Sequence, residues 1–487
     1  MRLLVALFIV GLVSLSGNAQ IEFYKVFSDN GADAGQGIVQ LADSSYVVTG
    51  WSSSFDGGSS QAILLKLDSL GNYQWSEDYG GSESDAGRRV LYKQGFGFFI
   101  CGYTNSIGNG GFDYYLVKVD ESGAFEWEQS YGGAGWEKVH DAALTRDTGT
   151  IMVGETSSNP IDDQDMYIVR TNSSGDTLWT KTFGGLGDDY LSCIRQQNDS
   201  VFVIGGRKFI EDSSMVKGYL AGIKDDGTIL WEDTMGVIGD YWINDIVLES
   251  NRWIAIGGTS GDSKNGVDFY QHVSDIGGAD YGGFELPDGG DNENMLITTY
   301  GALGDFYIAY ENDTYGVTTF EGGPDLLVAK YFNNISWANL YFKIAHVDPD
   351  IGGQIISTSD GGAIITGYTT GVVSGGNELF VAKIGPNDLM PDPETNMILD
   401  NIVTIDENEL VSSFAVYPNP AIDVLSIRTE NADYEEIRLL NSTGELVKSI
   451  PFSLIGQLNV SELPSGWYIL EVVGKATTAR KKVVINR

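Results

Sequence analysis

Residues 79–127 read YGGSESDAGRRVLYKQGFGFFICGYTNSIGNGGFDYYLVKVDESGAFEW. This stretch contains four short runs rich in aromatic and β-branched residues, at 87–93, 97–103, 112–120 and from 124 onward. Glycine, aspartate, asparagine and serine separate the runs, and these residue types favour turns. No run has the sustained 3.6-residue period of an amphipathic helix. The stretch therefore predicts four short β-strands.

The same pattern recurs at a fixed spacing along most of the chain. Residues 52 positions apart are Trp75, Trp127, Trp179 and Trp231, and likewise Gly50, Gly102, Gly154, Gly206 and Gly258. A repeat of about 50 residues with four strands is typical of a β-propeller blade. A stacked β-solenoid is the alternative architecture, although its repeats are usually shorter. We expect an all-β chain with a seven-bladed propeller over residues 20–388; six or eight blades stay open because the later repeats diverge.

The two ends of the repeat array complement each other. The segment around Phe23 matches the fourth strand of a blade, but no blade precedes it. The last repeat ends after its third strand, near Phe380 and Lys383. Pairing the extra strand with the incomplete last sheet would close the ring and remove both open edges. The sequence therefore predicts a propeller closed by an N-terminal strand.

The segments outside the array differ in composition. Residues 1–19 combine Arg2, an apolar run and a small-residue cleavage site, a pattern typical of a secretory signal peptide. The run is too short for a membrane span, and we expect no transmembrane segment. Residues 389–410 are acidic and predict an exposed linker. Residues 411–487 contain about seven short β-runs and predict a small β-sandwich.

The tail carries a set of motifs in a recognisable order. They include Tyr417, Pro418, Asn419, Pro420, Gly466, Tyr468, Lys481 and Lys482. In these residues the tail resembles the type A C-terminal sorting domain of the Bacteroidetes type IX secretion system. The resemblance implies the type IX secretion machinery as a partner. It also implies export through the periplasm, followed by release or display at the cell surface.

The array also resembles a known group, the secreted bacterial propeller repeats. The resemblance lies in Trp75 followed by Tyr79-Gly80-Gly81, and in Asp360-Gly361-Gly362 followed by Gly367. It implies the fold and says almost nothing about activity, because propellers carry unrelated functions.

Acidic residues offer two candidate cation sites. Asp33, Asp85, Glu137 and Asp189 share one register and would lie near the start of each innermost strand. They either bind Ca²⁺ or a cationic group, or cap their own turns by accepting backbone N–H groups. Repetition in successive blades favours capping. Asp162, Asp163 and Asp165 form the densest acidic loop and are candidate Ca²⁺ ligands, although the loop lacks the glycine and distal glutamate of an EF-hand.

The sequence favours a binding module over an enzyme. We find no nucleophile elbow, P-loop or HExxH motif, and therefore assign no catalytic residues. A net charge of −38 excludes nucleic acid as a partner. Trp136, Trp242 and Trp253 stand outside the repeated aromatic register and are candidate contacts for a glycan or a surface protein. The alternative is an extracellular hydrolase acting on polysaccharide or peptide at the channel mouth.

The two cysteines fall in different repeats. Cys101 lies in the second and Cys193 in the fourth, and each adjoins an apolar strand residue. Blades two and four do not touch in a ring, so we expect two separate buried thiols without a disulfide.

Overall fold

The computed structural model describes part of the chain in detail. The described residues are 23–28, 31–54, 59–159, 163–212, 214–236, 240–249, 252–259, 268–275, 280–286, 295–300, 306–312, 325–331, 338–344, 350–370, 376–385, 397–401, 415–417, 424–428, 434–441, 446–451, 455–464, 466–474 and 478–485. The chain divides into two compact units, Met1–Ile402 and Val403–Arg487. The ordered elements of both units are β-strands.

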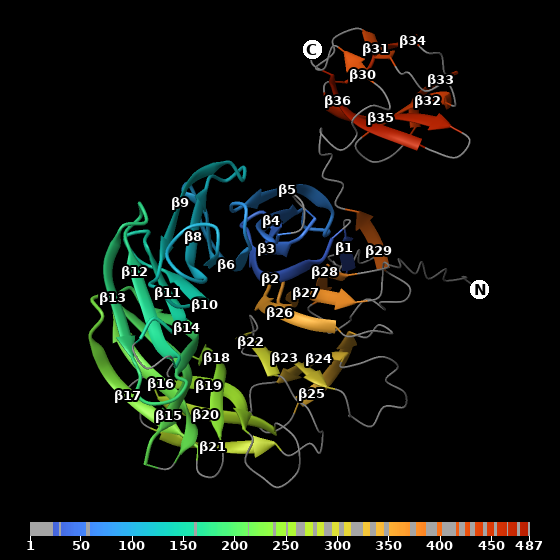
Figure 1. Ribbon diagram of the computed structural model, residues 1–487. Helices are drawn as coiled ribbons and strands as arrows, with labels where there is room; N and C mark the ends of the chain where they lie inside the picture. Colours follow the sequence, from blue (N-terminus) through green and yellow to red (C-terminus); the bar gives the residue numbers. More distant parts are fainter. Residues whose placement is uncertain are drawn as a thin grey trace, which may run out of the picture. The chain divides into compact units, whose positions relative to one another are not determined.

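The described strands of the first unit form seven sheets, arranged as the blades of a propeller (Figure 1). Six of these sheets contain four consecutive antiparallel strands, and the seventh combines three consecutive strands with the first strand of the chain and one further strand. Blade one contains β2 (Asp33–Gln40), β3 (Tyr46–Ser52), β4 (Gln61–Leu67) and β5 (Tyr73–Tyr79). Blade two contains β6 (Asp85–Lys93), β7 (Gly97–Thr104), β8 (Asp113–Val119) and β9 (Phe125–Tyr131). Blade three contains β10 (Glu137–Leu144), β11 (Thr150–Thr156), β12 (Asp165–Thr171) and β13 (Thr177–Phe183). Blade four contains β14 (Tyr190–Asn198), β15 (Val201–Ile210), β16 (Met215–Lys224) and β17 (Ile229–Met235).

The remaining blades follow the same order. Blade five contains β18 (Tyr241–Glu249), β19 (Arg252–Thr259), β20 (Asp268–Asp275) and β21 (Asp280–Leu286). Blade six contains β22 (Met295–Tyr300), β23 (Phe306–Asn312), β24 (Asp325–Tyr331) and β25 (Ala338–Ile344). Blade seven contains β26 (Asp350–Ser357), β27 (Ala363–Thr370), β28 (Asn377–Ile384) and β1 (Phe23–Ser28). The first strand of each blade contacts the first strand of the next, and β26 contacts β2, so the ring is closed.

The closing strand pairs as the sequence predicts. β1 runs antiparallel to β28, with Phe23 opposite Lys383 and Val26 opposite Phe380. A further strand, β29 (Met397–Asn401), pairs in parallel with the outer side of β1. This strand lies in the stretch for which the sequence predicts an exposed linker. The apolar run Met397-Ile398-Leu399 is its strand signal, and the surrounding acidic residues obscure it.

The tryptophan register and a further glycine register, Gly71, Gly123 and Gly175, form one contact between neighbouring blades. A Cβ atom on Gly123 would lie 2.9 Å from the ring of Trp75, so the outer-strand tryptophan packs directly on a glycine of the next blade. Gly123 has a φ of 89°, a conformation that glycine adopts without strain. The same contact joins Trp127 to Gly175 and Phe23 to Gly71. Phe23 therefore fills the tryptophan position for blade seven.

A third register reflects a close backbone approach inside each blade. A Cβ on Gly50 or Gly102 would lie 1.8 Å from a carbonyl oxygen of the inner strand, so only glycine fits. In blade five this position belongs to Gly257, where a Cβ would lie 1.6 Å from the Trp242 carbonyl oxygen. The predicted residue, Gly258, is one position away. The strand glycine of blade five thus follows that of blade four, Gly206, after 51 residues instead of 52.

The start of blade six also differs from the sequence interpretation, which places it at Tyr281-Gly282-Gly283. Tyr281-Gly282-Gly283 looks like the Tyr79-Gly80-Gly81 turn that follows an outer strand. In the structure these residues lie within β21, the outer strand of blade five, and Leu286 takes the place of Tyr79 opposite the third strand. The likeness in sequence is local and does not fix the register.

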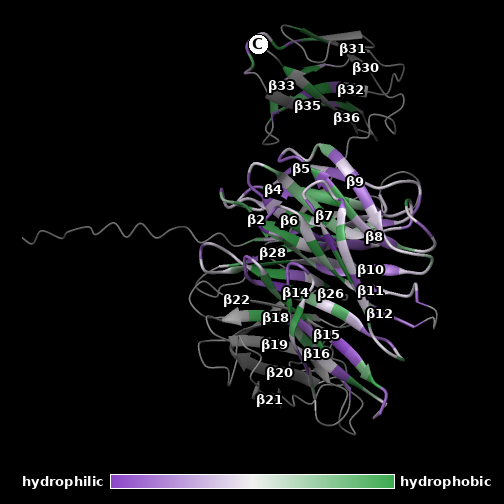
Figure 2. Ribbon diagram, turned by 90° about the vertical axis from the view of Figure 1, so that its left-hand side faces the viewer, coloured by the Kyte–Doolittle hydropathy of each residue, from purple (hydrophilic) through white to green (hydrophobic). Residues whose placement is uncertain are grey.

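The core of the propeller lies between the blades. Apolar side chains of the second and third strands pack against those of the adjacent sheet, and most of them are fully buried. Figure 2 shows this contrast, with hydrophobic colour on the inner strands and hydrophilic colour on outer strands such as β9. Cys101 and Cys193 are both buried and free, and they belong to different core clusters. Two separate thiols are therefore confirmed.

The second unit has one core shared by two sheets. One sheet contains β30 (Ala415–Tyr417), β31 (Val424–Arg428) and β34 (Ile455–Asn459). The other contains β32 (Tyr434–Leu440), β33 (Leu446–Pro451), β35 (Gly466–Gly474) and β36 (Thr478–Ile485). A single cluster of buried residues includes Leu425 and Leu458 of the first sheet with Leu439 and Leu470 of the second. The two sheets therefore pack face to face as a small sandwich.

We predict that weakening the closing strand destabilises the propeller. Phe27 of β1 is fully buried in the cluster that joins blades seven and one. Phe27→Ala should lower the free energy of unfolding by about 3–5 kcal/mol, because it leaves a cavity at the closure. Denaturant unfolding of the full chain, followed by tryptophan fluorescence, measures this change. The control Phe125→Ala, at a side chain 55% exposed, should change stability by less than about 0.5 kcal/mol. Equal effects of the two changes would contradict the prediction.

Candidate functional site

Every inner strand contains a β-bulge at the same position. The register shift falls between Gly35 and Gly37 in β2 and between Gly87 and Arg89 in β6, and the other five inner strands shift at the matching place. A bulge inserts one unpaired residue and turns its side chain in a new direction. The inserted residues include Gln36, Arg88 and His140. These side chains belong to the inner wall of the ring.

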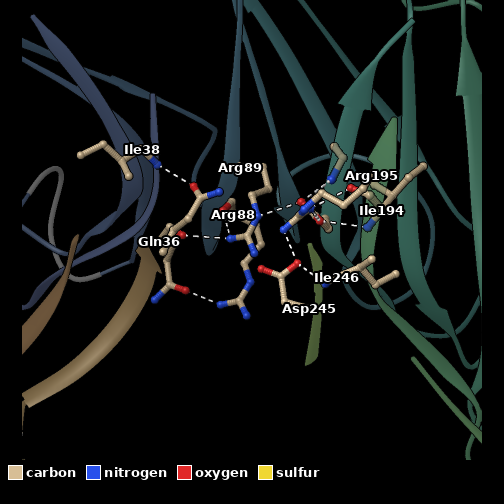
Figure 3. A network of polar contacts seen from close by, with 11 residues as sticks. Gln36, Ile38, Arg88, Arg89, Ile194, Arg195, Asp245 and Ile246 are labelled. Atoms are coloured by element: carbon tan, nitrogen blue, oxygen red, sulfur yellow. Dashed lines mark hydrogen bonds and ion pairs between the residues drawn. The ribbon is translucent and has the colours of Figure 1, made fainter. Parts of the chain in front are cut away.

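Charged residues next to the bulges connect four consecutive blades. Arg89 Nε donates to Asp141 Oδ1 at 2.9 Å, and Arg195 Nη1 donates to Asp141 Oδ2 at 2.5 Å. Arg195 also pairs with Asp245 of blade five (Figure 3). Asp141 further accepts the backbone N–H of Ile194 at 3.0 Å. We call this chain of contacts between Arg89, Asp141, Arg195 and Asp245 the ionic belt.

The contacts continue into blades one and seven through neutral groups. Arg89 Nη1 donates to the Gln36 carbonyl oxygen at 3.0 Å, and Arg88 donates to the Gln36 side chain. The Ile38 backbone N–H donates to Gln354 Oε1 of blade seven at 2.8 Å. Burial alone would raise the pKa of Asp141, but Arg195 and Arg89 outweigh it and hold that pKa below its usual value. Asp141 is therefore a carboxylate that links blades two, three and four.

The acids at the inner-strand starts hold their own turns. Asp85, Glu137 and Asp189 are almost fully buried. Each accepts the backbone N–H of the glycine four residues before it, at distances of 2.8, 2.8 and 2.9 Å. Glu137 also accepts Thr156 Oγ1–H at 2.6 Å. This is the capping arrangement that the sequence allows as one of its two interpretations.

At the junction of blades two and three, a second carboxyl group meets one of these acids. A Cβ on Gly132 would lie 1.8 Å from Asp113 Oδ1 and 2.1 Å from Glu137 Oε2, so both oxygens face this glycine. Burial, with Glu137 adding to it, raises the pKa of Asp113 to about 6, although the Asn109 N–H at 2.7 Å opposes the shift. A second carboxylate close by makes ionisation of Asp113 less favourable, in the same direction as burial.

Aromatic side chains gather beside this junction. Tyr103 packs edge-on against Phe112, and Phe112 packs edge-on against Trp136, each with ring centroids 5.2 Å apart. Lys138 lies over the Trp136 ring, 5.5 Å from its centroid. Trp136 is 53% exposed. The indole of Trp136 is therefore held in place by its contact with Phe112, while about half of the side chain is exposed to solvent.

Basic and aromatic groups extend the arrangement into blade four. The His140 and Tyr190 rings lie 5.5 Å apart, and Arg207 lies over Tyr190 at 4.4 Å from its centroid. His140 Nε2 is 3.4 Å from Glu155 Oε2. Burial would raise the pKa of Glu155, but His140, Lys138 and Arg207 together lower it. We call the following set the aromatic–basic row: Tyr103, Phe112, Trp136, Lys138, His140, Tyr190 and Arg207.

The predicted tryptophans have different positions relative to this row. Trp136 is part of it. Trp242 is partly buried at the start of β18, and it lies 52 residues after Tyr190 and 104 after Lys138, so it shares their register after all. Trp253 lies in β19, opposite Leu248, and its side chain is outside the described part. The other members of the row escape sequence analysis because they come from several strands and loops of three blades.

The acidic loop before β12 is tied to its surroundings. Asp162 lies outside the described residues. Asn159 Nδ2 donates to Asp163 Oδ1 at 2.6 Å and to Asp165 Oδ2 at 2.8 Å, and the Gly187 N–H donates to Asp163 Oδ2 at 2.9 Å. Within the described ranges, no three acids, histidines or cysteines converge as metal ligands. Asp162, Asp163 and Asp165 stay a prediction as a Ca²⁺ site.

The sorting residues lie in the second unit where they are described. Tyr417 ends β30, and Gly466 begins β35. Tyr468 is buried, and its hydroxyl donates to the Pro464 carbonyl oxygen at 3.0 Å. Lys481 and Lys482 lie in β36, whereas Pro418, Asn419 and Pro420 fall outside the described residues.

Fold and tail together define an exported seven-bladed β-propeller with a C-terminal sorting domain. Residues 415–486 match the family described as secretion system C-terminal sorting domain. The tail directs the chain through the type IX secretion system to the cell surface or the medium. Among the residues that the structure describes, we find no helix with the length and hydropathy to cross a bilayer.

One curated protein shows detectable sequence similarity. The chain is 22% identical over 203 residues to the ulvan lyase NLR42 of Nonlabens ulvanivorans. The similar part is 41% of this chain and 35% of the relative, so it spans about a third of that protein's length.

Solved structures with a similar fold are distant in sequence. The polysaccharide lyase Uly1 is 13% identical with a TM-score of 0.43, covering 72% of this chain and 90% of Uly1. The WD40 domain of Neurospora crassa Pan2 is 12% identical with a TM-score of 0.41, covering 75% of this chain and 98% of that domain. Scores this low transfer neither substrate nor activity to the chain.

We predict that the ionic belt depends on Asp141. Asp141→Ala leaves Arg89 and Arg195 without their shared carboxylate. It should lower the free energy of unfolding by about 3–5 kcal/mol, the usual loss when one partner of a buried ion pair is removed. Denaturant unfolding measures the change, with Asp199→Ala as control at a side chain 77% exposed. A loss below about 1 kcal/mol would show that the belt is not needed.

We also predict a pH-dependent contribution from Asp113. Its pKa of about 6 exceeds the ordinary value of 3.8, so the folded state holds a proton that the unfolded state releases. This contribution is present below pH 4 and is lost as the pH rises through 6. The amide of Asp113→Asn can still accept the Asn109 N–H, but it cannot ionise. The variant should gain about 1–2 kcal/mol over the native chain between pH 4 and pH 7. Thermal melts across this range test it, with Asp199→Asn as the matched control. A pH-independent difference would contradict the prediction.

Proposed function

We propose that the propeller is a glycan-binding module at the cell surface or in the medium, and that the aromatic–basic row is its binding face. The observation that carries this proposal is the exposed indole of Trp136, which packs on Phe112 and lies beside Lys138. An exposed aromatic ring of this kind offers apolar area to one face of a sugar at small entropic loss. The neighbouring lysine, histidine and arginine supply hydrogen-bond donors to the hydroxyl or acidic groups of the same ligand.

The support for Trp136 is built into the chain. A Cβ on Gly111 would lie 2.5 Å from Trp136 Cδ1, so the glycine allows the indole to lie directly on the backbone. The Trp136 N–H of the backbone donates to Ser157 Oγ at 2.8 Å, which fixes the loop. A fixed aromatic group loses little conformational freedom on binding. These contacts favour a preformed binding surface over incidental exposure.

The location of the row fits a ligand outside the cell. The basic groups of the row lie beside acids: Glu155 is next to His140 and Lys138, and Asp188 Oδ2 is 3.7 Å from Arg207. Such a mixture of hydrogen-bond donors and acceptors suits a hydroxylated ligand. The name of the relative NLR42, an ulvan lyase, agrees with a polysaccharide as ligand. A surface protein remains the other candidate from the sequence.

A second candidate function is an extracellular enzyme that cleaves polysaccharide at the same face. The observation in its favour is the Tyr190 hydroxyphenyl group between His140 and Arg207. Burial raises the pKa of Tyr190, although Arg207 opposes the shift, so the phenol keeps its proton at neutral pH. A protonated phenol beside an imidazole can donate a proton to a leaving oxygen. Release of new reducing ends from a bound polysaccharide, lost in Tyr190→Phe, would identify this activity.

We predict that Trp136→Ala lowers glycan affinity at least tenfold, because removal of a central aromatic contact usually loses 1.4 kcal/mol or more. A glycan array with the full chain identifies the ligand, and calorimetry then compares variants. Trp136→Phe should retain most of the affinity. Tyr73→Ala, which removes an aromatic side chain 37% exposed on the outer strand β5, should have no effect. An array without hits, or hits that Trp136→Ala leaves unchanged, would overturn the proposal; a protein captured through Trp136 would point to the protein alternative.

A further inference from the structure

The charges on the inner wall do not balance. In the described part of the inner wall, the ionic belt and its neighbour Arg88 contain three guanidinium groups, on Arg88, Arg89 and Arg195. They face two carboxylates, Asp141 and Asp245. Arg89 and Arg195 occupy both carboxylates between them. Arg88 is the cation left over.

Among the residues that the structure describes, Arg88 has no carboxylate partner. Its guanidinium donates to Gln36 Oε1, a neutral amide oxygen. Its Nε is buried and has no hydrogen-bond partner. Burial, together with the like charge of Arg89, lowers the pKa of Arg88 to about 10. The carboxylate that opposes this shift is Asp141, which already accepts hydrogen bonds from Arg89 and Arg195.

An unpaired cation in this position needs an explanation. Removing a charge from water without pairing it is unfavourable, and proteins usually place a neutral residue there. Gln36 occupies the matching bulge position in blade one, so the fold accepts an amide at this site. The bulge turns the Arg88 side chain out of the regular strand, and the side chain stays partly exposed. Solvent and small ions can therefore reach the end of the guanidinium group, although its Nε is enclosed.

We propose that Arg88 is an anion-binding residue that takes a carboxylate or sulfate group on the inner wall of the ring. The planar guanidinium offers paired donors that match the two oxygens of such a group. The Gln36 amide accepts a hydrogen bond from the guanidinium but, being neutral, does not neutralise its charge. The anion is either free or carried by a polymer. The site stands apart from the proposed glycan function, because a free anion requires no contact with the aromatic–basic row.

The first test compares sulfate with chloride at equal ionic strength, using the full chain. Calorimetric titration with sodium sulfate should show saturable binding to the native chain and to Arg146→Gln, whose arginine is 77% exposed. Arg88→Gln should lose binding. Arg88→Lys keeps the charge but loses the planar pair of N–H donors, and its affinity for sulfate should fall at least tenfold. In sulfate-free buffer, Arg88→Gln should melt no lower than the native chain, because it removes an unpaired charge. Equal sulfate binding by all four proteins would overturn the proposal.

The second test separates a free anion from one carried by a polymer. Dextran sulfate and unsulfated dextran serve as matched probes. Binding of dextran sulfate that requires both Arg88 and Trp136 would place the anion on a glycan that crosses the row. Sulfate binding that requires Arg88 but not Trp136 would identify a free anion. If Arg88→Gln and the native chain bind sulfate and dextran sulfate equally, the anion site does not exist. The glycan function of Trp136 would still be tested by its own titration.

Discussion

The pairing of β1 with β28 is the constraint on which the rest of the propeller depends. A blade buries its two faces only when a neighbour stands on each side, so an open array leaves two apolar faces exposed. Phe23 and Phe27 contribute to the cluster that joins blades seven and one, and Tyr24 and Val26 to the one that joins blades six and seven. The closed ring in turn fixes the inner strands at the spacing that the ionic belt requires.

The 52-residue spacing combines several separate physical requirements. The tryptophan and the turn glycine are the two halves of one contact between blades, as in Trp75 and Gly123. In blades one and two, the tyrosine that ends the outer strand reaches the same turn: Tyr79 donates to the Gly123 carbonyl oxygen at 2.7 Å, and Tyr131 donates to that of Gly175 at 2.6 Å. The strand glycine is required by a carbonyl oxygen that leaves no room for a side chain. The spacing thus combines contacts between neighbouring blades with a close backbone approach inside each blade.

Sequence analysis predicted the architecture well because those requirements repeat. The seven blades, the closing strand and the two buried thiols all follow from register. It failed where register slips: in blade five, where Gly257 replaces Gly258, and at β21, where Tyr281 imitates a turn residue. The acidic residues around β29 concealed a strand. The candidate site was found only through Trp136, because Tyr103, His140 and Arg207 are brought together by adjacent blades and bulges. A bulge has no sequence signal of its own, so the orientation of Arg88 could not be read in advance.

The distance along the chain between the two closing strands affects how the molecule is made. Phe23 pairs with Lys383, so 360 residues separate the partners, and nearly the whole propeller must exist before the circle can form. Contacts between such distant segments form late and slowly in folding. Until then the backbone groups of β1 are unpaired, and partly folded chains can associate by pairing through this strand. β29 follows soon after β28 and covers the outer side of β1, so the segment that precedes the sorting domain also seals the last edge of the newly closed ring.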